Sequence, residues 1–392
     1  MSQRESIVIV DGVRTAIGSY GGVFRDVDAH QLGATAIRSV LDRTGIAPEE
    51  VDEVVMGQVG QVGPDAYNAR RCAIEAGIPP SATAMNVNRL CSSGLQAIVT
   101  AVQQVALGDA DVVVAGGDES MSRQPALDFD SHAGWKLGHR RLVDGTLSLV
   151  TDPFGRYPMG MTAEKVAARF GISRNDQDEF ALRSQHRAGR AIAEGRFLEE
   201  VVPVAVPGAD SPVMNDEHPR PTVTMEQMSR LRPVFDVDGS VTAGNSSGIN
   251  DGAGAVVVMR ETEARARGLT PRLRLRSWAV TGIEPEIMGF APAQAVPVAL
   301  EKAGMRLDDV DLIELNEAFA AQAVAVIRSL NADIQVVNPD GGAIALGHPV
   351  GATGAILTVK LMHALERMDR TVGIVTMCIG GGQGMAAVFE RP

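Results

Sequence analysis

Apolar residues follow two different periods along this chain. Short apolar runs at 7–13, 111–117 and 371–377 are bounded by acidic residues, glycine or turns, a pattern typical of strands buried on both faces. Between such runs, apolar residues return every three or four positions, as they do from Leu95 to Val105, which indicates amphipathic helices. Alternating strands and helices predict mostly parallel sheets with helices on both faces, so the predicted fold class is α/β.

The chain also contains an internal repeat. Segment 44–58 aligns without a gap with segment 303–317, at an offset of 259 residues. The same offset brings the helix-like segment 32–43 onto 291–302, and the apolar run at 111–117 close to the run at 371–377. Several segments in the same order at one offset indicate a duplicated fold rather than a chance similarity.

The ends of the two copies differ, which predicts an insertion in the first copy. Segment 248–259 resembles 380–390, but at an offset near 130, so the first copy holds about 130 extra residues. We therefore predict three units, and expect the charged, proline-rich insertion to hold a long helix broken near Gly171. The units are an N-terminal half (1–120 with 246–270), an inserted loop domain (121–245) and a C-terminal half (271–392).

Composition and charge narrow the classes of partner. The net charge of −12 over 392 residues argues against nucleic acid or an anionic membrane surface as the main partner, although a local basic patch can still bind a small anion. The three cysteines form no CxxC pair, so we expect neither a disulfide framework nor a structural zinc site. The sequence leaves no room for the apolar stretch of a signal peptide, and no uninterrupted apolar run of membrane-spanning length is evident. We expect a cytoplasmic protein.

Cys91 is the first candidate for chemistry. It stands in "NRLCSSGLQAI" among small polar residues, in or just before the first turn of a predicted helix. A helix N-terminus can lower the pKa of a thiol and make it a nucleophile, whereas most free cysteines are inert residues of the core. The local sequence leaves both interpretations open, because a nucleophilic thiol also needs a base.

His348 is the best candidate for that base. It lies in the glycine-rich stretch "GGAIALGHPVGATGA", close to the position that the repeat pairs with Cys91, so a duplicated fold would bring both residues to matching helix starts. A histidine satisfied by backbone groups in the core is the alternative. Cys378 ends a predicted strand before three glycines, where backbone N–H groups can converge on a developing negative charge or simply form a tight turn.

Two further residues and several missing motifs complete this picture. Asn316 and Glu317 end a predicted strand, where Asn316 can hold a water or carbonyl oxygen and Glu317 can orient a histidine, or where both can cap a helix. The glycine spacing does not fit the dinucleotide fingerprint, and the sequence contains no phosphate-loop, HExxH or CxxC pattern. These absences weaken the dehydrogenase, nucleotidase and metalloenzyme interpretations.

Four blocks taken together resemble the thiolase family, in order and with family-like spacing: "NRLCSSGLQAI", "NEAFA", "GGAIALGHPVGATGA" and "CIGGGQGMA". The segments "VDGVRTAIGSYGG" and "RPVFDVDGSVTAGNSSGINDGA" also resemble that family, so the resemblance covers nearly the whole chain. It implies a thiolase-like fold, with two duplicated βαβ-rich halves, mixed sheets, helices in layers and an inserted lid. It also implies reversible, CoA-dependent cleavage of 3-oxoacyl-CoA through an acyl-cysteine intermediate, or the reverse Claisen condensation.

The resemblance implies a role for each of five residues. Cys91 matches the nucleophile, His348 its activating base and Cys378 the second acid–base group. Asn316 matches the residue that holds a water beside His348 in one oxyanion hole, and the backbone N–H groups of Cys91 and Gly380 match the other. No metal and no cofactor are implied, since CoA is a substrate, and family members suggest a homodimer or a homotetramer.

The resemblance also implies a CoA site and bears on the acyl chain length. The residues that match family positions near CoA are Met159, Arg220, Phe235, Ala243, Ser247, Ala318 and Phe319, with Arg220 near the adenine. Acetoacetyl-specific biosynthetic members carry His in a His-Met-Gly lid motif, whereas this chain has Pro158 in "YPMGMTAE". Pro158 resembles the degradative 3-oxoacyl-CoA thiolases and favours a broader range of acyl chains.

Four alternatives remain beside this interpretation. They are an acetoacetyl-CoA-specific biosynthetic acetyltransferase, a ketoacyl synthase of the same fold, a cysteine hydrolase, and a non-catalytic acyl-CoA or lipid-binding protein. A ketoacyl synthase lacks the second cysteine, and a hydrolase explains neither Cys378 nor the duplication. A silent binding protein would be expected to have lost one of the matching residues, and none is missing.

Overall fold

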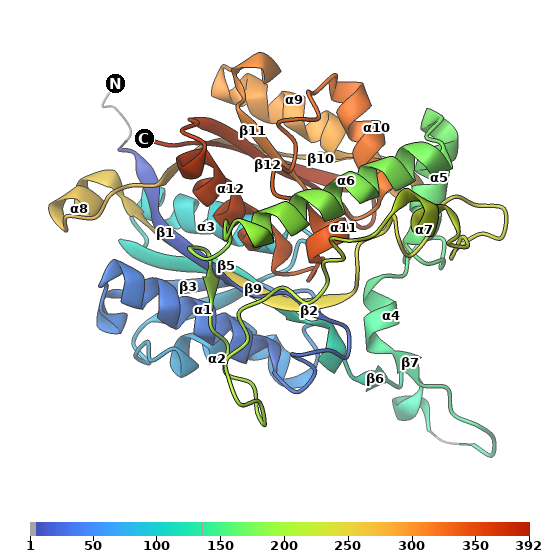
Figure 1. Cartoon of the computed structure of the whole chain (residues 1–392). Helices are drawn as coiled ribbons and strands as arrows, with labels where there is room; N and C mark the ends of the chain where they lie inside the picture. Colours follow the sequence, from blue (N-terminus) through green and yellow to red (C-terminus); the bar gives the residue numbers. More distant parts are fainter. Residues whose placement is uncertain (1–4, 135) are drawn as a thin grey trace.

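The computed structural model describes residues 5–134 and 136–392. The first four residues, on which the signal-peptide expectation partly rests, lie outside the described residues. Most strands in the described part of the chain belong to one 11-stranded sheet with the order β11-β12-β13-β10-β1-β9-β5-β3-β4, where β2 also pairs with β9 and β8 with β1. The two halves of this sheet meet where β1 pairs antiparallel with β10 (Figure 1).

The first half contains the following elements, in chain order: β1 (Ile7–Thr15), β2 (Gly18–Ser19), α1 (Ala29–Thr44), β3 (Glu53–Gly57), α2 (Asn68–Glu75), β4 (Thr83–Val87), α3 (Ser93–Leu107), β5 (Val112–Ser120), and, after the insertion, β9 (Asn250–Arg260) and α8 (Glu261–Ala266). The second half contains β10 (Leu273–Gly282), α9 (Pro292–Ala303), β11 (Leu312–Leu315), α10 (Ala320–Leu330), α11 (Ala343–Leu346), α12 (Thr353–Arg367), β12 (Val372–Ile379) and β13 (Gln383–Glu390).

The halves repeat one pattern, as the sequence predicts. In each half a helix follows the first strand, a short parallel strand comes next, and a helix then leads into another parallel strand. The paired elements are β1 with β10, α1 with α9, β3 with β11, α3 with α12, β5 with β12, and β9 with β13. Even β4 has a counterpart, because Val337 makes a parallel bridge to Ile313 of β11. The predicted α/β fold with duplicated halves and mixed sheets is confirmed.

The elements stack in layers around three apolar cores. One core joins α1 and α2 to the outer face of the first half-sheet, a second joins α3 and α12 to both half-sheets, and a third joins α9 and α10 to the outer face of the second half-sheet. Helices α3 and α12 therefore form the central layer (Figure 1). A helix in that layer is apolar on most sides, because it is covered from above and below.

The central helices meet at two glycines that the repeat relates to each other. A Cβ added to Gly354 of α12 would lie 2.3 Å from the backbone nitrogen of Leu95, and one added to Gly94 of α3 would lie 2.8 Å from the nitrogen of Ala355. Only glycine permits this approach of backbone to backbone. The contact brings the N-terminal ends of both helices, with their preceding loops, to one place.

The insertion, residues 121–249, runs between β5 and β9. Its elements are β6 (Ala126–Leu127), β7 (Val143–Asp144), α4 (Gly145–Leu149), α5 (Gly160–Phe170), α6 (Arg174–Ala193), β8 (Val201–Val202) and α7 (Met225–Ser229). The predicted long helix is broken where expected, since Gly171 ends α5 in the left-handed conformation and the Ser173 side chain caps α6. The arm that contains β6 and β7 projects from the body of the molecule (Figure 1).

One stretch bears on the expectation that no uninterrupted apolar run spans a membrane. By length and mean hydropathy Leu90–Leu107 could cross a membrane, although polar residues such as Ser92, Gln96 and Gln103 interrupt it. It is more than half buried and contains α3, which packs on the central sheet and against α12. The apolar character of this stretch is therefore explained by its place in the core.

Candidate active site

Cys91 lies in a tight turn immediately before α3. Leu90 adopts φ +49°, a left-handed conformation that costs a residue with a branched side chain of order 1 kcal/mol or more. The turn is held by the Ser93 N–H, which donates to the Leu90 carbonyl at 2.9 Å, and by the Arg89 N–H, which donates to Ser93 Oγ at 2.9 Å. The buried side chains of Ser92 and Ser93 are small, and the turn leaves the Cys91 thiol half-buried.

The surroundings of Cys91 favour a neutral thiol at rest. Burial against an apolar cluster of Val59, Met121 and Val350 raises the pKa of the thiol, although N–H groups of Gly380 and of Cys91 itself oppose this by donating to the sulfur. The pKa is thus raised, where the sequence suggested that a helix N-terminus would lower it. Desolvation outweighs the local dipoles here, so the thiol needs a base to become a nucleophile.

Cys378 lies at the end of β12, beside the Cys91 loop. It is fully buried, packed with Met288 and Ala318, and burial, reinforced by the nearby Cys91 sulfur, raises the pKa of its thiol far above the ordinary value. A thiol that stays protonated at neutral pH is a proton donor. After it, Gly381 and Gly382 adopt φ values of +81° and +87° and turn the chain, so that the Gly380 N–H points toward the Cys91 sulfur.

His348 is buried in the loop between α11 and α12. Its backbone N–H donates to Asn250 Oδ1 at 2.9 Å, and its Nδ1 lies 2.7 Å from Thr353 Oγ1. The Thr353 hydroxyl donates its proton to the Pro349 carbonyl at 2.8 Å, so it accepts from the imidazole, and Nδ1 carries the ring proton. Burial lowers the pKa of His348 to about 4, so at neutral pH its Nε2 is an unprotonated base.

The Asn316 side chain contacts the unprotonated Nε2 of His348. Its Nδ2 lies 3.3 Å from His348 Nε2, and its backbone N–H donates to the Thr376 carbonyl at 2.9 Å, which fixes it to β12. Asn316 Oδ1 is buried and has no hydrogen-bond partner among the described residues. Because buried polar atoms normally find a partner, this oxygen is suited to hold a water or a substrate donor.

Glu317 does not orient a histidine, one of the two roles that the sequence suggested. Its carboxylate accepts hydrogen bonds from Ser184 Oγ at 2.6 Å, from Asn338 Nδ2 at 2.7 Å and from the Ile344 N–H at 3.2 Å. Glu317 therefore acts on α11 and on the insertion, not on the ring of His348.

Most of the predicted CoA residues gather beside Cys378. Met159, Ala318 and Phe319 belong to the same small apolar cluster as Cys378, and the Phe235 ring packs edge-to-face on Phe319 with centroids 6.1 Å apart. The Ser247 N–H donates to the Ala318 carbonyl at 3.0 Å. The other two are exposed: Ala243, in the turn from Thr242 to Asn245, and Arg220.

Sequence reasoning missed two residues that hold His348. Thr353 fixes the tautomer of the ring, and Asn250 fixes its backbone. Thr353 stands inside the glycine-rich block and Asn250 inside the segment "GNSSGINDGA", so both residues belong to stretches that resemble the family. Only the folded chain shows that these side chains point to the histidine.

Two thiols, a neutral buried imidazole and two converging N–H donors make up a site suited to acyl transfer through thioesters. The family model "Thiolase, N-terminal domain" matches residues 7–262, and "Thiolase, C-terminal domain" matches 269–391. The chain therefore belongs to the thiolase family, and it is an acyltransferase.

Individual relatives agree with this family membership. The chain is 50% identical to the beta-ketothiolase BktB of Cupriavidus necator, over 98% of this chain and 99% of that protein. It is 48% identical to an acetyl-CoA acetyltransferase of Rhizobium meliloti, with the same coverage.

Solved structures support the same fold. The acetyl-CoA acetyltransferase of Bacillus anthracis matches with a TM-score of 0.97 at 41% identity, over all of both chains. Human mitochondrial 3-ketoacyl-CoA thiolase in complex with CoA matches with a TM-score of 0.95 at 42% identity, over 99% of this chain and 98% of that one. The thiolase fold predicted from the sequence is confirmed.

Proposed function

We propose that Cys91 is the acyl carrier of this thiolase, with His348 as its base and Cys378 as the second acid–base group. The observation that supports this most is the convergence of the Cys91 and Gly380 N–H groups on one half-buried sulfur, beside a second thiol. The carbonyl oxygen of an acyl group attached to that sulfur would lie near both donors. They would stabilise the negative charge of a tetrahedral intermediate.

The first half-reaction cleaves the 3-oxoacyl chain. His348 Nε2 takes the proton of Cys91, and the sulfur attacks the C3 carbonyl of the substrate. The C2–C3 bond breaks, and its electron pair stays on C2 as the enolate of acetyl-CoA. Asn316, through a water on its unpaired Oδ1, and protonated His348 stabilise the enolate oxygen, and Cys378 donates its proton to C2.

The second half-reaction returns the enzyme to its starting state. The Cys378 thiolate takes the thiol proton of a second CoA, whose sulfur attacks the acyl group on Cys91. The Cys91 sulfur leaves and regains its proton from His348. Because one thioester replaces another, the free-energy change of this step is small. The whole sequence of steps in reverse is a Claisen condensation. The thiols and the imidazole carry out each proton transfer, and the backbone donors stabilise the negative charge, so we propose no cofactor, with CoA as a substrate.

CoA would reach the thiols along the insertion. We propose 121–245 as the CoA-binding lid and the cluster of Met159, Phe235, Ala318 and Phe319 as the wall of the pantetheine channel, since it is continuous with Cys378. Ser247 and Ala243 extend this wall toward the surface. Exposed Arg220, with Arg230 and Arg232 on the same insertion, would supply positive charge for the phosphates of CoA.

We propose a broad acyl range, because Pro158 stands where acetoacetyl-specific members carry His. The relatives include proteins named for both beta-ketothiolase and acetyl-CoA acetyltransferase activity. A thiolysis series of 3-oxoacyl-CoA substrates from four carbons upward tests this. Comparable kcat/KM at four and six or more carbons is expected, and a sharp optimum at four carbons would overturn the proposal in favour of the acetoacetyl-specific alternative.

The catalytic roles are tested by substitution of each cysteine and of His348. We expect Cys91→Ala to have no measurable thiolysis, and His348→Ala and Cys378→Ala to lower kcat by roughly 100- to 10,000-fold. Cys72→Ala is the matched control, because Cys72 is as fully buried as Cys378 and its hydrogen bonds are with Asp118 and Asn68. Undiminished turnover in Cys91→Ala contradicts the mechanism.

We further propose a homodimer or homotetramer in the cytoplasm. Strand β4 ends the sheet, and its residues are exposed or half-buried, including Met85, so a second copy could pair with this edge. The arm with β6 and β7 carries exposed Phe129, Leu137 and Leu142, which suits a second contact. Light scattering should give two or four copies for the full chain, and fewer for Met85→Lys. A monomeric chain would exclude this assembly.

A further inference from the structure

The loop that carries His348 begins at α11, a helix of four residues. Helix α11 ends at Leu346, with Gly347 as its C-cap, one residue before His348. Its single turn is closed by the Leu346 N–H, which donates to the Gly342 carbonyl at 2.9 Å, and by the Gly347 N–H, which donates to the Ala343 carbonyl at 2.8 Å. Such a short helix has almost no cooperative stability of its own. Its geometry must therefore be imposed by neighbours.

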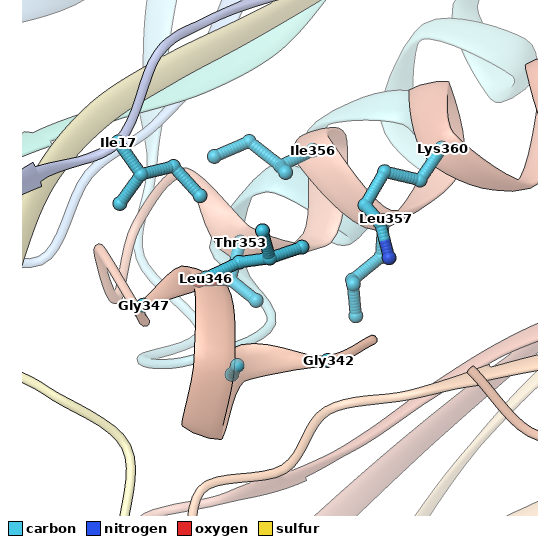
Figure 2. A pocket seen from close by; sticks show the side chains of 9 residues that line it. Ile17, Gly342, Leu346, Gly347, Thr353, Ile356, Leu357 and Lys360 are labelled. Atoms are coloured by element: carbon cyan, nitrogen blue, oxygen red, sulfur yellow. The ribbon is translucent and has the colours of Figure 1, made fainter. Parts of the chain in front are cut away.

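The packing around this buried helix leaves one small gap. A cavity of about 10 Å³, room for about one water, lies between α11 and α12, lined on one side by Ala343, Leu346 and Gly347 and on the other by Thr353 and Lys360 (Figure 2). Ile344, Ala345 and Leu346 pack in the apolar cores, and Ile17, Ile356 and Leu357 also line this gap. The gap lies on the side of the helix that faces Thr353, the partner of the histidine ring.

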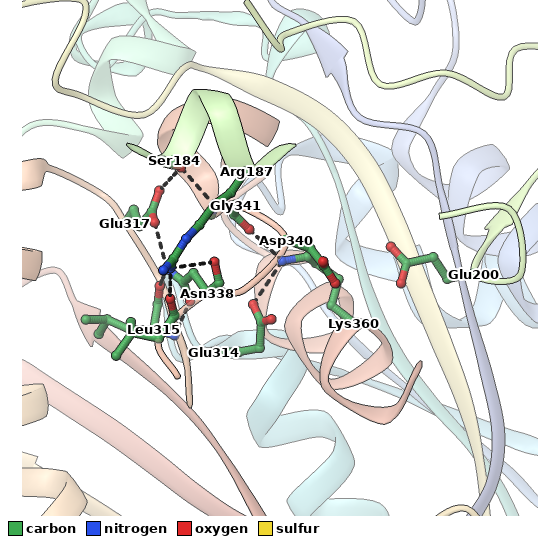
Figure 3. Close-up of polar contacts among 12 residues, drawn as sticks. Ser184, Arg187, Glu200, Glu314, Leu315, Glu317, Asn338, Asp340, Gly341 and Lys360 are labelled. Carbon is green, nitrogen blue, oxygen red and sulfur yellow. Dashed lines mark hydrogen bonds and ion pairs between the residues drawn. The ribbon is translucent and has the colours of Figure 1, made fainter. Parts of the chain in front are cut away.

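Polar side chains from α6 also hold α11 in place. Ser184 Oγ donates to Glu317 Oε2 at 2.6 Å, as Figure 3 shows, and accepts from the Gly342 N–H at 3.0 Å. Glu317 in turn accepts from the Ile344 N–H. The neighbouring Gln185 donates to the Ile344 carbonyl at 3.2 Å. Two N–H groups at the start of α11, those of Gly342 and Ile344, and the Ile344 carbonyl are therefore bound by Ser184, Gln185 and Glu317, which form a junction between α6 and α11.

The same junction reaches the candidate CoA segment. Gln185 Oε1 accepts from the Arg220 N–H at 2.7 Å, so one amide spans from α11 to the segment that carries Arg220. Ser184, Gln185 and Glu317 are all buried, so their hydrogen bonds act without competition from bulk water. Gly342 packs so closely that an added Cβ would lie 2.2 Å from the Glu317 carboxyl carbon.

We propose that Ser184 and Gln185 are positioning residues for His348. They lie in the insertion, touch neither thiol, and act by holding α11 so that the imidazole stands correctly beside Cys91 and Asn316. This inference rests on the proposed role of His348 as the base. It makes the insertion part of the catalytic machinery as well as the lid over CoA.

The test compares α6 variants in the full-length enzyme. Ser184→Ala leaves the Gly342 N–H and one Glu317 oxygen without their partner, and we expect kcat to fall roughly 10- to 100-fold while KM for CoA stays the same. Gln185→Ala is expected to lower kcat and also to raise KM for CoA, because it releases the Arg220 segment. The matched control is Gln177→Ala, a buried glutamine of the same helix that bonds Ser240 and Ile172.

A second measurement separates positioning from loss of stability. The rate at which iodoacetamide alkylates Cys91 at pH 7 depends on proton removal by His348, so it should fall with kcat in Ser184→Ala and stay unchanged in Gln177→Ala. Should Ser184→Ala fail to fold, Ser184→Cys keeps the size of the side chain with a much weaker hydrogen-bonding group, and the same two rates should fall.

The outcomes distinguish this inference from the mechanism beneath it. Wild-type kcat in Ser184→Ala, or a lower kcat with a wild-type alkylation rate, overturns the positioning role and leaves the catalytic role of His348 intact. Wild-type alkylation and turnover in His348→Ala would instead overturn the proposed function itself.

Discussion

The two halves of the molecule repeat one pattern of elements, yet the loops that precede their central helices carry different residues. Helix α3 is preceded by Cys91. In this part of the repeat the offset is 260 residues, one more than between 44–58 and 303–317, because Gly94 corresponds to Gly354. The same offset relates Cys91 to Gly351. A Cβ at Gly351 would lie 2.6 Å from Glu119 Oε2 and 2.8 Å from the Asp118 carbonyl. The second half therefore has no room for a side chain where the first half presents its thiol.

The same two helices also differ in burial. Helix α12 is buried along its whole length except for its last turn, whereas α3 exposes Leu107 and other residues on one side. The loop before α12 is enclosed with it, so His348 is buried and its pKa falls to about 4, while Cys91 remains partly accessible. Duplication supplied two equivalent loops, and unequal burial made one suited to a base and the other to a nucleophile that must meet its substrate.

The largest predicted effect comes from breaking the contact that joins the two helices. Gly354→Ala would place a methyl group 2.3 Å from the Leu95 nitrogen, so the backbones must separate. We expect a loss of about 3 kcal/mol in the free energy of unfolding, with loss of thiolysis, because the loops that carry Cys91 and His348 both move. Urea unfolding and a thiolysis assay measure the two effects.

The control for this prediction is Gly282→Ala at the end of β10, where the nearest atom to an added Cβ is 3.9 Å away. Its free energy of unfolding should change by less than about 0.5 kcal/mol. If Gly354→Ala were as stable as this control, the close crossing of α3 and α12 would not be what joins the halves.

The second prediction uses pH to separate the buried base from the nucleophile. Since burial holds the folded pKa of His348 near 4, below the ordinary value of 6.5, folding favours the neutral ring. The stability from this group is present above pH 6.5 and is lost as pH falls toward 4. Between pH 7 and pH 5 the wild-type enzyme should lose about 2 kcal/mol more unfolding free energy than His348→Gln does.

Urea unfolding of both proteins at the two pH values measures this difference. Cys91→Ala is the control from the other half and should show the wild-type dependence, because the raised pKa of Cys91 keeps its thiol protonated at both values. Equal pH dependence in wild type and His348→Gln would mean that the imidazole is not held neutral by burial.

The comparison also explains what the sequence could predict. The repeat survives as ordered segments such as 44–58 and 303–317, so the duplicated α/β architecture follows from the sequence. Helix breaks follow as well, because Gly171 and Ser173 act through local backbone geometry and capping. Cys91, His348 and Cys378 each stand inside a contiguous motif block, so the sequence alone points to all three.

Properties that depend on contacts between distant residues could not be predicted from the sequence. The pKa of Cys91 depends on the balance between desolvation by Val59, Met121 and Val350 and the donors of a distant glycine turn. The local sequence therefore left a lowered pKa and an inert thiol open, and the folded chain raises the pKa. The suggestion that Glu317 orients a histidine came from its position next to Asn316, but the side chains of adjacent residues can point to opposite sides. Its partner Ser184 lies 133 residues earlier in the chain, where no local pattern marks it.

The smallest predicted effect concerns the region that only one half possesses. The second half joins β12 to β13 by a short glycine turn, whereas the first half has residues 121–249 between β5 and β9, with Arg220 exposed on that insertion. If the insertion binds CoA while the shared framework does the chemistry, Arg220→Ala should raise KM for CoA by roughly two- to fivefold and leave kcat unchanged, because an exposed ion pair is worth at most about 1 kcal/mol. Steady-state thiolysis at low salt measures this, and the difference should shrink at high salt, which screens exposed charges.

With pantetheine as the acceptor, which lacks the nucleotide phosphates, the variant and wild type should have the same KM. Arg306→Ala removes an equal charge from an exposed position of the second half and should change neither constant. A KM increase shared by both variants would indicate a general effect of net charge, and would remove the evidence that Arg220 binds the phosphates of CoA.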